Sequence, residues 1–353
     1  MSNRKKKICI CHAKAPFMSG GAEILTTDLH SNLIKRGFDA EVISLPFKWY
    51  PAYEVINSAL AWRLVDLEEV DGEKIDLVIG TKYPAYAVKH SNKVVWLFHQ
   101  HRPAYDLKNE TEYFGLCNGL TDNGEEVSEM VKNIDNRSFH ETKGIYTISK
   151  NVSERLKEYN GFDSEYLYPP PRFENQLFCE NYDDYILSVG RVAALKRLEI
   201  LINSIQFCDK KIKVLIAGTG NCIEELKKLT ANLNLEDRVT FLGYVSDEEV
   251  LRLYANAFAV FFAPKNEDYG YITIESFMSK KPVITCDDSG GILEFVEDSI
   301  NGYVCPKDYK IIGERINKLY NNKGLCKQLG NSGYEKVRYI SWDTVINKLT
   351  STI

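Results

Sequence analysis

Short apolar runs and amphipathic stretches alternate along the whole chain. The apolar runs are typical of strands that are buried on both faces in a parallel sheet. The stretches between them repeat apolar residues at helical spacing, as Leu25, Leu29 and Leu33 do within the helix predicted over 22–36. Strands that alternate with helices over this length predict an α/β fold built from layers.

The predicted elements fall into two groups with a proline-rich stretch between them. We expect strands at 7–12, 39–45, 75–80, 94–98 and 144–148 in the first group, and at 185–189, 213–217, 239–242, 258–263 and 283–285 in the second. We expect helices at 22–36, 152–159, 198–207, 222–233, 247–254, 273–279 and 311–320. The run Pro169-Pro170-Pro171 forbids a helix and disfavours a central strand, so 169–183 is predicted to be a linker. Two α/β halves joined in this way indicate a cleft between two domains.

The composition is that of an ordinary soluble globular protein. The chain has 353 residues, 44% of them hydrophobic and 26% charged, a length that favours two domains. Its net charge of -5 argues against broad nucleic-acid binding, which requires a basic surface. The dense basic cluster at 4–7 directly precedes the first strand. We interpret it as a solvated lead-in, with a weak anchor to acidic lipid as the alternative.

Targeting and thiol chemistry point to the cytoplasm. No apolar run approaches the roughly 20 residues that span a bilayer. The apolar segment 8–15 is short and contains His12 and Lys14, which argues against a signal peptide. The nine cysteines include no Cys-x-x-Cys pair, and Cys9 and Cys11 would share one face of a strand. Reduced thiols therefore fit better than a metal site or a disulfide framework.

The most informative stretch runs from Phe261 to Glu275. An apolar strand breaks at Pro264 into a polar turn, passes through Gly270 and continues as a helix. A glycine turn that leads into a helix N-terminus is a ready site for an anion, and ligands bind at the carboxyl ends of strands in such sheets. Two carboxylates, Glu267 and Glu275, stand on either side of Gly270 with seven residues between them.

Two cations follow another predicted strand. Arg191 comes just after strand 185–189, and Lys196 stands five positions later. An arginine fork and a compact lysine charge at the end of a strand suit a diphosphate, and a surface charge pair that leads into a helix is the alternative. The chain contains no Asp-x-Asp motif. We therefore expect no metal ion to take part, so that these cations and the helix N-terminus near Gly270 stabilise the anion.

Two segments of the first half are further candidates. Gly20 and Gly21 lie between the first strand and the first helix, where main-chain amides can face a phosphate or a sugar. A tight turn that needs glycine flexibility is the alternative. His99, Gln100 and Arg102 abruptly follow the strand at 94–98. A histidine there can contact a sugar hydroxyl or orient a reacting group, although a lone histidine is more often structural.

Several short motifs, each weak alone, occur in an order and spacing that together indicate a protein family. They are Ser19-Gly-Gly-Ala-Glu23, Tyr168-Pro-Pro170, Ser188-Val-Gly-Arg191 with Lys196, Phe241-Leu-Gly-Tyr-Val245, Glu267-x7-Glu275 and Lys281-Pro-Val-Ile-Thr285 followed by Ser289-Gly-Gly291. With these motifs the chain resembles the family 4 glycosyltransferases, retaining enzymes of the GT-B fold, over essentially its whole length. The resemblance implies two Rossmann-like parallel-sheet domains that face a central cleft. Residues 1–170 would form an acceptor-side domain, 171–335 a nucleotide-sugar-binding domain, and 336–353 a helix that crosses back to the first domain.

The resemblance also implies a role for each candidate residue. The expected catalytic residues are Glu267 at the donor sugar, His99, Arg191 and Lys196. Besides the two cations at the diphosphate, donor binding would involve Tyr244, Val245, Gly270, Tyr271, Ile272 and, at the ribose hydroxyls, Glu275. Gly20 and Gly21, also expected in donor binding, would lie by the phosphates or by the acceptor. Gln100, Arg102 and Tyr105 would lie on the acceptor side. The chain departs from the common pattern at Asp268 and Arg197, where family members often carry glycine.

The implied activity is transfer of a sugar from a UDP- or GDP-linked donor to a hydroxyl of a glycan or lipid-linked acceptor, with retained configuration and no metal or other cofactor. A sugar-nucleotide epimerase of the same fold and a non-catalytic nucleotide-binding relative are the alternatives. A dehydrogenase is disfavoured because Gly218-Thr219-Gly220 and the turn at Gly20 both lack the full dinucleotide fingerprint. The implied setting is polysaccharide biosynthesis in the cytoplasm, at the inner face of the membrane for a lipid-linked acceptor. The sequence leaves the oligomeric state open.

Overall fold

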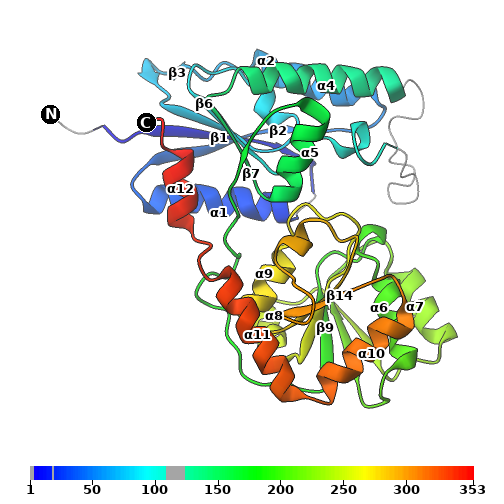
Figure 1. Cartoon of the computed structure of the whole chain (residues 1–353). Coiled ribbons are helices and arrows are strands. Elements are labelled where there is room, and N and C mark those ends of the chain that lie inside the picture. The colour runs from blue at the N-terminus through cyan, green and yellow to red at the C-terminus, as the bar shows by residue number, and fades with distance from the viewer. Residues whose placement is uncertain (1–3, 18–19, 109–123) are drawn as a thin grey trace. The chain divides into compact units, whose positions relative to one another are not determined.

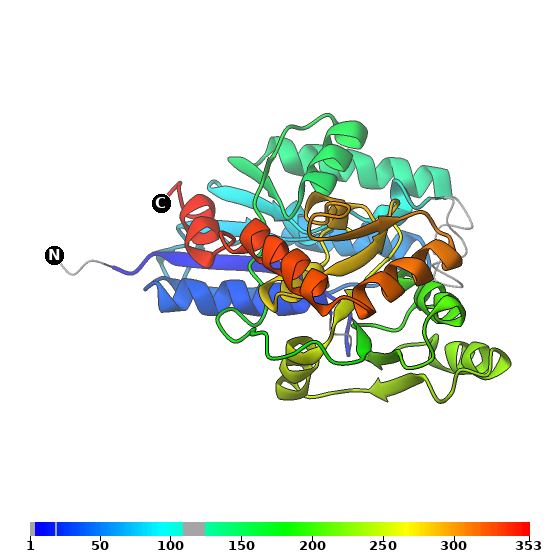
Figure 2. The ribbon, with the colours of Figure 1, turned by 60° about the horizontal axis from the view of Figure 1, so that its bottom comes forward.

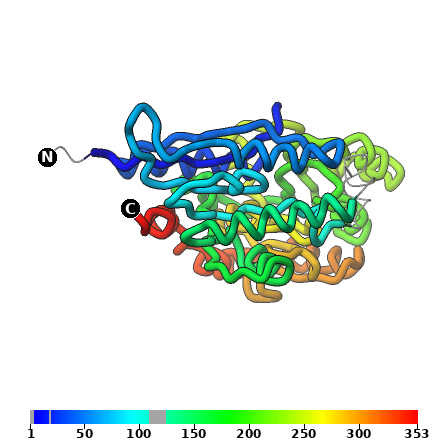
Figure 3. The backbone as a smooth tube through the Cα atoms, turned by 90° about the horizontal axis from the view of Figure 1, so that it is seen from above, coloured from blue at the N-terminus to red at the C-terminus, as the bar shows by residue number. Residues whose placement is uncertain are grey.

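The computed structural model describes residues 4–17, 20–108 and 124–353. They belong to two compact units, each of which contains a parallel sheet with packed helices (Figures 1 and 2). The first unit comprises Met1–Pro170 and Ser341–Ile353, and the second comprises Pro171–Ile340. Figure 3 follows the C-terminal end of the chain, in red, back to the first unit, which also holds the N-terminal strand, in blue. The α/β class predicted from the sequence is confirmed.

The sheet of the first unit has six strands in the order β2-β1-β5-β6-β7-β8, all paired in parallel. The strands are β1 Lys7–Lys14, β2 Asp39–Pro46, β5 Leu77–Gly80, β6 Lys93–Leu97, β7 Gly144–Thr147 and β8 Glu165–Tyr166, and β3 Glu69–Val70 with β4 Glu73–Lys74 forms a small separate hairpin. The helices are α1 Gly21–Lys35, α2 Tyr53–Leu64, α4 Gly124–His140, α5 Lys150–Asn160 and α12 Trp342–Leu349. Helix α12 joins this unit through contacts with α1 and through the ring of Trp342, 6.2 Å from that of Trp96.

The sheet of the second unit also has six parallel strands, in the order β11-β10-β9-β12-β13-β14. They are β9 Tyr185–Val189, β10 Lys213–Ala217, β11 Val239–Gly243, β12 Ala259–Phe261, β13 Val283–Cys286 and β14 Gly302–Cys305. The helices are α6 Leu198–Ser204, α7 Ile223–Asn232, α8 Asp247–Asn256, α9 Tyr271–Met278, α10 Tyr309–Tyr320 and α11 Lys323–Val337.

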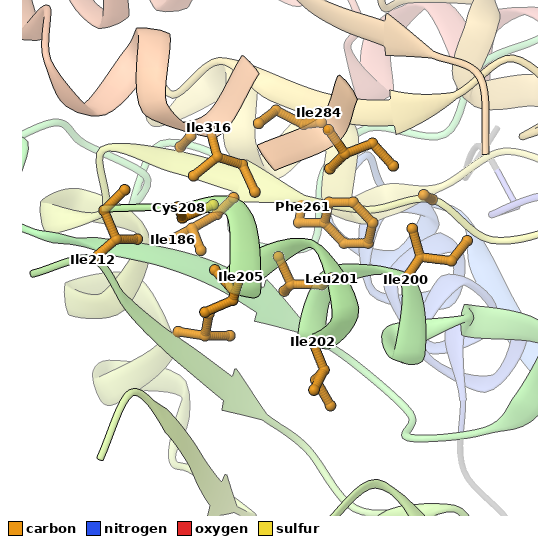
Figure 4. Close-up of a cluster of buried hydrophobic side chains, with 14 of the residues drawn as sticks. Ile186, Ile200, Leu201, Ile202, Ile205, Cys208, Ile212, Phe261, Ile284 and Ile316 are labelled. Carbon is orange, nitrogen blue, oxygen red and sulfur yellow. The ribbon is translucent and has the colours of Figure 1, made fainter. Parts of the chain in front are cut away.

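Burial on both faces explains the apolar runs of this second sheet. On one face, Ile186 of β9 and Phe261 of β12 pack with Leu201 of α6 and Ile316 of α10 (Figure 4). The next residue of β9, Leu187, belongs to a separate cluster on the other face. Because successive strand residues point to opposite faces, a strand between two helical layers must be apolar throughout.

The basic cluster at 4–7 is tied into the first unit. Arg4 and Lys6 contact the carboxylate of Asp76 at 2.8 and 3.3 Å, and Lys7 contacts Asp39 and Glu73 at 2.8 and 3.0 Å. Three of its four cations therefore face carboxylates of their own unit, while residues 4–6 remain exposed, as expected for a solvated lead-in. No helix in the described part of the chain is long and apolar enough to span a bilayer.

Some predicted boundaries differ from the structure. The helix expected over 198–207 ends at Ser204, and Ile205–Phe207 continues as a 3-10 turn, a common ending for an α-helix. The strand expected over 258–263 pairs only at Ala259–Phe261. Helices α2, α4 and α11 and strand β14 were not predicted.

Candidate functional site

The second unit brings the loop after β9 close to the start of α9. Gly190 has φ +118°, and a Cβ there would lie 3.1 Å from Cδ1 of Ile272 in the first turn of α9. Arg191, which follows, is exposed. Ser188, Gly190, Arg191, Lys196 and Phe262 line a small surface hollow together with Val189, Leu198 and Ile216. The predicted cations therefore lie at the carboxyl edge of this sheet, as expected for residues that follow a parallel strand.

Lys196 and Glu267 form the central contact of the candidate site. The Nζ atom of Lys196 donates to Oε2 of Glu267 at 2.5 Å and lies 5.2 Å from the ring centroid of Phe262. The side chains are 24% and 25% exposed, so a ligand can reach both. The ring of Phe262 also packs against the start of α9, since a Cβ at Gly270 would lie 3.0 Å from this ring. This chain of contacts connects the β9 loop, the carboxylate and the start of α9.

A neighbouring loop holds Glu267 through the backbone. The amide of Glu267 donates to the carbonyl of Ser289 at 3.1 Å, and the amide of Gly291 donates to the carbonyl of Glu267 at 2.8 Å. Gly290 has φ +67°, and a Cβ there would lie 2.7 Å from the carbonyl oxygen of Glu267. Two glycines in succession therefore let the 289–291 loop approach Glu267 closely.

Arg197 stabilises the loops around Glu267. In the sequence this residue stood out only as a departure from a motif. Its side chain is buried, and Nε and Nη2 donate to the carbonyls of Ala263 and Pro264 at 2.8 and 2.9 Å. Nη1 and Nη2 also donate to the carboxylate of Asp288 at 2.7 and 2.6 Å. Its φ of +50° lies in the left-handed region that glycine adopts readily. These four hydrogen bonds of the guanidinium group fasten the segment after β12 to Asp288, which precedes the 289–291 loop.

The N-terminus of α9 has the geometry expected for an anion site. Gly270 caps it with φ +84°, and a Cβ there would lie 2.9 Å from Cγ1 of Ile292. Tyr271 and Ile272 are the first two helical residues. Backbone N–H groups of a first helical turn lack partners within their own helix, and the helix dipole places partial positive charge there.

Glu275 is buried one turn further along α9. Its side chain is 6% exposed, and its Oε2 accepts a hydrogen bond from the hydroxyl of Tyr254 in α8 at 2.9 Å. Burial raises the pKa of Glu275 to about 7, although the Tyr254 hydrogen bond acts in the opposite direction. Tyr254 was not predicted from the sequence. A tyrosine on the apolar stripe of a helix carries no signal that its hydroxyl meets a carboxylate.

The turn between β11 and α8 presents the remaining donor-side candidates. The side chain of Tyr244 is 83% exposed, and Val245 is half-buried. Gly243 before them has φ +68°, and its carbonyl accepts from the amide of Gly218 at 2.8 Å. A Cβ at Gly218 would lie 1.8 Å from the carbonyl oxygen of Gly190, so this glycine serves close packing between loops.

The candidates of the first unit lie around its own sheet edge. Gly20 caps α1 with φ -160° and ψ -167°, extended values that any residue adopts, so the turn does not require glycine flexibility at this position. Gly21 is the first residue of α1, and Ser19 lies outside the described residues. His99 is half-buried, and its Nδ1 lies 2.9 Å from the carbonyl oxygen of Gln100.

The expected acceptor-side residues take part in interior contacts. Gln100 is fully buried and donates to Asn160 of α5. The hydroxyl of Tyr105 donates to the buried carboxylate of Asp135 in α4 at 2.7 Å, and burial raises the pKa of Asp135 to about 7. Arg102 pairs with Asp106 at 2.5 Å. These contacts fix the segment that carries His99. Any contact of Gln100, Arg102 and Tyr105 with an acceptor stays a prediction.

No three His, Cys, Asp or Glu side chains among residues 4–17, 20–108 and 124–353 are grouped so that they could hold a metal ion. The two sets of candidate residues belong to different units. Arg191, Lys196, Glu267 and α9 come together in the second unit, and His99, Gly20 and Gly21 belong to the first.

Comparison with known proteins bears on the family of the second unit and on the fold of the chain. Residues 172–336, which lie in the second unit, match the family model described as glycosyl transferases group 1. A sucrose-phosphate synthase from Thermosynechococcus elongatus superposes with a TM-score of 0.76 at 14% identity, over 98% of both chains. The structure of HepE from Anabaena in complex with UDP and glucose superposes with a TM-score of 0.68 at 17% identity, over 98% of this chain and 100% of that one. The chain has the GT-B fold.

Individual proteins of similar sequence also match this chain. An uncharacterized glycosyltransferase of Methanocaldococcus jannaschii is 25% identical over 94% of this chain and 93% of its own length. The alpha-1,3/1,6-mannosyltransferase of Homo sapiens is 26% identical over 52% of this chain and 50% of its own length, so the alignment spans half of that relative. By the matched family model and these relatives, the chain is a glycosyltransferase.

Proposed function

We propose that this glycosyltransferase transfers a sugar from a UDP- or GDP-linked donor to a hydroxyl of a glycan or lipid-linked acceptor, with retained configuration and without a metal ion. The observation that carries the proposal is the Lys196–Glu267 pair, 2.5 Å apart and connected through Phe262 to the N-terminus of α9. A cation, a carboxylate and a helix N-terminus in one unit suit a substrate that carries both a diphosphate and a sugar.

The cations and the helix would stabilise the leaving group. When the bond from the anomeric carbon to the diphosphate oxygen breaks, negative charge grows on the diphosphate. Lys196, Arg191 and the amides of Tyr271 and Ile272 would receive that charge at positions fixed before the reaction. Prearranged donors of this kind need no reorganisation at the transition state and supply a large share of catalysis.

The two carboxylates would act at opposite ends of the donor. Glu275, buried and held by Tyr254, would accept hydrogen bonds from the ribose hydroxyls. Glu267 would face the donor sugar and stabilise positive charge as the sugar approaches an oxocarbenium ion. We favour this electrostatic role over a covalent nucleophile because Lys196 already shares the charge of Glu267.

The remaining candidates would complete the two substrate sites. The turn at Tyr244 and Val245 would hold the base, largely through main-chain atoms. His99 would contact the donor sugar from the first unit, and Gln100, Arg102 and Tyr105 would support the acceptor side. The acceptor hydroxyl would attack from the face that the diphosphate leaves, which retains the configuration.

The relatives support a hexose donor and a biosynthetic setting. The human relative is named as a mannosyltransferase, and the HepE structure contains UDP and glucose. We propose that the reaction takes place in the cytoplasm, at the inner face of the membrane when the acceptor is lipid-linked. The Arg4–Lys7 cluster offers little for such attachment because most of its charge is paired.

Calorimetric titration with UDP, GDP, ADP and NAD tests donor binding. We expect UDP or GDP to bind and to raise the unfolding temperature, since a ligand that binds only the folded state stabilises it. Binding of NAD alone, or of none of the four, would contradict the proposal. Proton NMR of the product formed from the matching sugar nucleotide then reports the anomeric configuration, and inversion would contradict the retaining mechanism.

Analysis of the products formed from the sugar nucleotide also distinguishes a transferase from an epimerase and from a non-catalytic relative. An epimerase converts its sugar nucleotide into a free isomer without any acceptor, whereas a transferase releases the nucleoside diphosphate. A non-catalytic relative binds the nucleotide and produces neither. Chelation with EDTA should leave turnover unchanged, and a loss that added Mg²⁺ restores would disprove metal independence.

A further inference from the structure

A lysine and a cysteine of the second unit meet outside the candidate site. Nζ of Lys281 donates to Sγ of Cys179 at 3.2 Å, although the two residues are 102 positions apart, so the contact depends on the fold. Lys281 lies just before β13, and Cys179 lies in the stretch before β9. Residues that precede parallel strands belong to the amino edge of a sheet, opposite the carboxyl edge where the candidate site lies.

Lys281 is a buried cation without an ion-pair partner. It is 0% exposed, its Nζ also donates to the carbonyl of Asn181, and it lies 4.0 Å from the ring centroid of Tyr182. No carboxylate of the described residues forms an ion pair with it, and Asp183 acts on it from farther away. A buried charge requires a counter-ion, and a carbonyl and a ring carry no full charge. The group in hydrogen-bond contact with Lys281 that can become an anion is the thiol of Cys179.

One shared proton gives this pair two forms with the same total charge. In one form a thiol faces a neutral amine, and in the other a thiolate faces an ammonium group. Burial lowers the pKa of Lys281, while the neighbouring sulfur of Cys179 acts in the opposite direction. The thiolate is the nucleophile toward oxidants, and the neutral amine is a nucleophile toward an oxidised sulfur. The pair therefore contains both groups that a two-step reaction at this sulfur needs.

Cys179 can also be reached from solvent. Among the described cysteines, Cys179 and Cys222 are partly exposed, and the others are buried. Cys222 has no lysine against its sulfur, which contacts Asn221 at 3.7 Å. Burial raises the pKa of Cys222, and neighbouring glutamates raise it further. Cys222 thus serves as an internal control for a partly exposed thiol without a cationic partner.

We propose that Cys179 is an oxidation site for hydrogen peroxide and that Lys281 traps the oxidised sulfur in a covalent N–S crosslink. The thiolate attacks one peroxide oxygen, the O–O bond breaks, and sulfur loses two electrons to the peroxide, which yields a sulfenic acid and water. The amine of Lys281 then attacks this sulfur, and the sulfenic oxygen leaves as water with a proton from the amine. Sulfenic acids condense with backbone nitrogen in the same way. One thiol, one amine and one peroxide thus give the crosslink and two waters.

Peptide mass spectrometry of the full-length chain tests the proposal, which does not depend on the transferase function. After peroxide treatment and digestion without reductant, we expect the Cys179 and Lys281 peptides to be joined, with a mass two hydrogens below their sum. Dithiothreitol should release them, and treatment of the chain unfolded in urea should not join them. Fragment ions distinguish this bond from a disulfide to Cys326, a buried thiol of α11 that also acts on Lys281. Such a disulfide, or no link at all, would overturn the proposal.

Lys281→Arg supplies the matched variant, because it keeps a cation and removes the amine. It should abolish the link and leave a sulfenic acid at Cys179 that dimedone labels. Lys280→Arg changes the adjacent lysine, which lies 5.2 Å from the ring centroid of Tyr334, and should leave the link intact. In the unsubstituted chain at pH 7, iodoacetamide should alkylate Cys179 about tenfold faster than Cys222. Equal rates would overturn the thiolate assignment, and this measurement decides even if Lys281→Arg does not fold.

Discussion

Nζ of Lys196 lies 2.5 Å from Oε2 of Glu267, and the two residues reach this contact from different loops of the second unit. Lys196 ends the short 3-10 turn after β9, and Glu267 stands between β12 and α9. A diphosphate that binds Lys196 must therefore compete with Glu267 for the same ammonium group. This competition gives the two residues opposite effects on binding but similar effects on turnover.

Lys196→Ala should mainly slow the chemical step. The ammonium group is expected to act most strongly on charge that develops as the diphosphate leaves, so kcat should fall by about a hundredfold or more. The Kd of the nucleoside diphosphate should rise less, because Glu267 already occupies part of the lysine charge. Steady-state kinetics at saturating donor measure the first effect and calorimetry measures the second. Lys228→Ala on the exposed surface of α7 is the control, and unchanged turnover in Lys196→Ala would disprove its role.

Glu267→Gln should tighten nucleotide binding while it slows transfer. The substitution frees Lys196 from its competing anion, and an ion pair that is a quarter exposed contributes about 1 kcal/mol or less, so UDP or GDP affinity should increase about twofold to fivefold. Transfer should slow by about a hundredfold, because the sugar loses its stabilising carboxylate. Glu224→Gln breaks a more exposed pair with Lys227 on α7 and should change neither quantity. Weaker nucleotide binding in Glu267→Gln would show that Glu267 does not compete for Lys196.

Glu275→Gln should remove a pH dependence of stability. In the folded chain burial raises the pKa of Glu275 to about 7, whereas the unfolded chain has a pKa near the ordinary value of 4.5. Between these values the folded state binds more protons, so its stability falls as pH rises through this window and stays lower above it. Glutamine does not titrate, so Glu275→Gln lacks this loss of stability. The difference in free energy of unfolding, variant minus unsubstituted chain, should therefore rise by about 3 kcal/mol at most between pH 4.5 and 7.

Calorimetric unfolding from pH 4.5 to 8 measures this difference. Asp135, whose pKa is also raised to about 7, is present in both proteins, so its contribution cancels. Glu199→Gln in the first turn of α6 is the comparison, since burial also raises the pKa of Glu199. Glu275→Gln should also bind UDP or GDP about tenfold more weakly, through weaker hydrogen bonds to the ribose. A parallel pH profile for the two proteins would mean that Glu275 titrates normally.

The sequence predicted the strands of the second unit well because both faces of that sheet are buried. Tyr185–Val189 and Lys213–Ala217 were predicted with the bounds that the structure has. Helix α11 was missed because Gly324, Gly330 and Gly333 indicate breaks in a helix. A Cβ at Gly330 would lie 1.8 Å from the carbonyl oxygen of Lys280, and one at Gly333 would lie 2.2 Å from the ring of Phe277. These glycines allow α11 to pack against α9, a tertiary reason that a local pattern does not contain.

The candidate site could be predicted only in part for the same reason. Glu267 and Glu275 stood out by their spacing around a glycine turn. Their partners are distant in sequence: Tyr254 comes from another helix, and Lys196 comes from a turn 71 positions away. The support that Arg197 and Asp288 give to the loop depends on a buried guanidinium group, which looks like an ordinary surface charge in the sequence. Contacts set by tertiary packing leave no periodic signal.

Gly290→Ala should displace Glu267 and abolish most of the activity. A methyl group there would lie 2.7 Å from the carbonyl oxygen of Glu267 and 2.8 Å from the carbonyl carbon of Asn266, so the backbone itself must move. The left-handed φ of +67° adds strain of about 1–2 kcal/mol, and overpacking adds about 1–3 kcal/mol. Gly161→Ala at the end of α5 is the comparison: it has a similar φ of +76°, a ψ of 5° where Gly290 has -130°, and nothing within 4 Å, so it gives the cost of a methyl group in the αL region without overpacking. Calorimetry should give a lower unfolding temperature for Gly290→Ala than for Gly161→Ala, and only Gly290→Ala should lose transfer activity at a temperature where both are folded. Equal activity of the two variants would mean that the approach of this loop does not position Glu267.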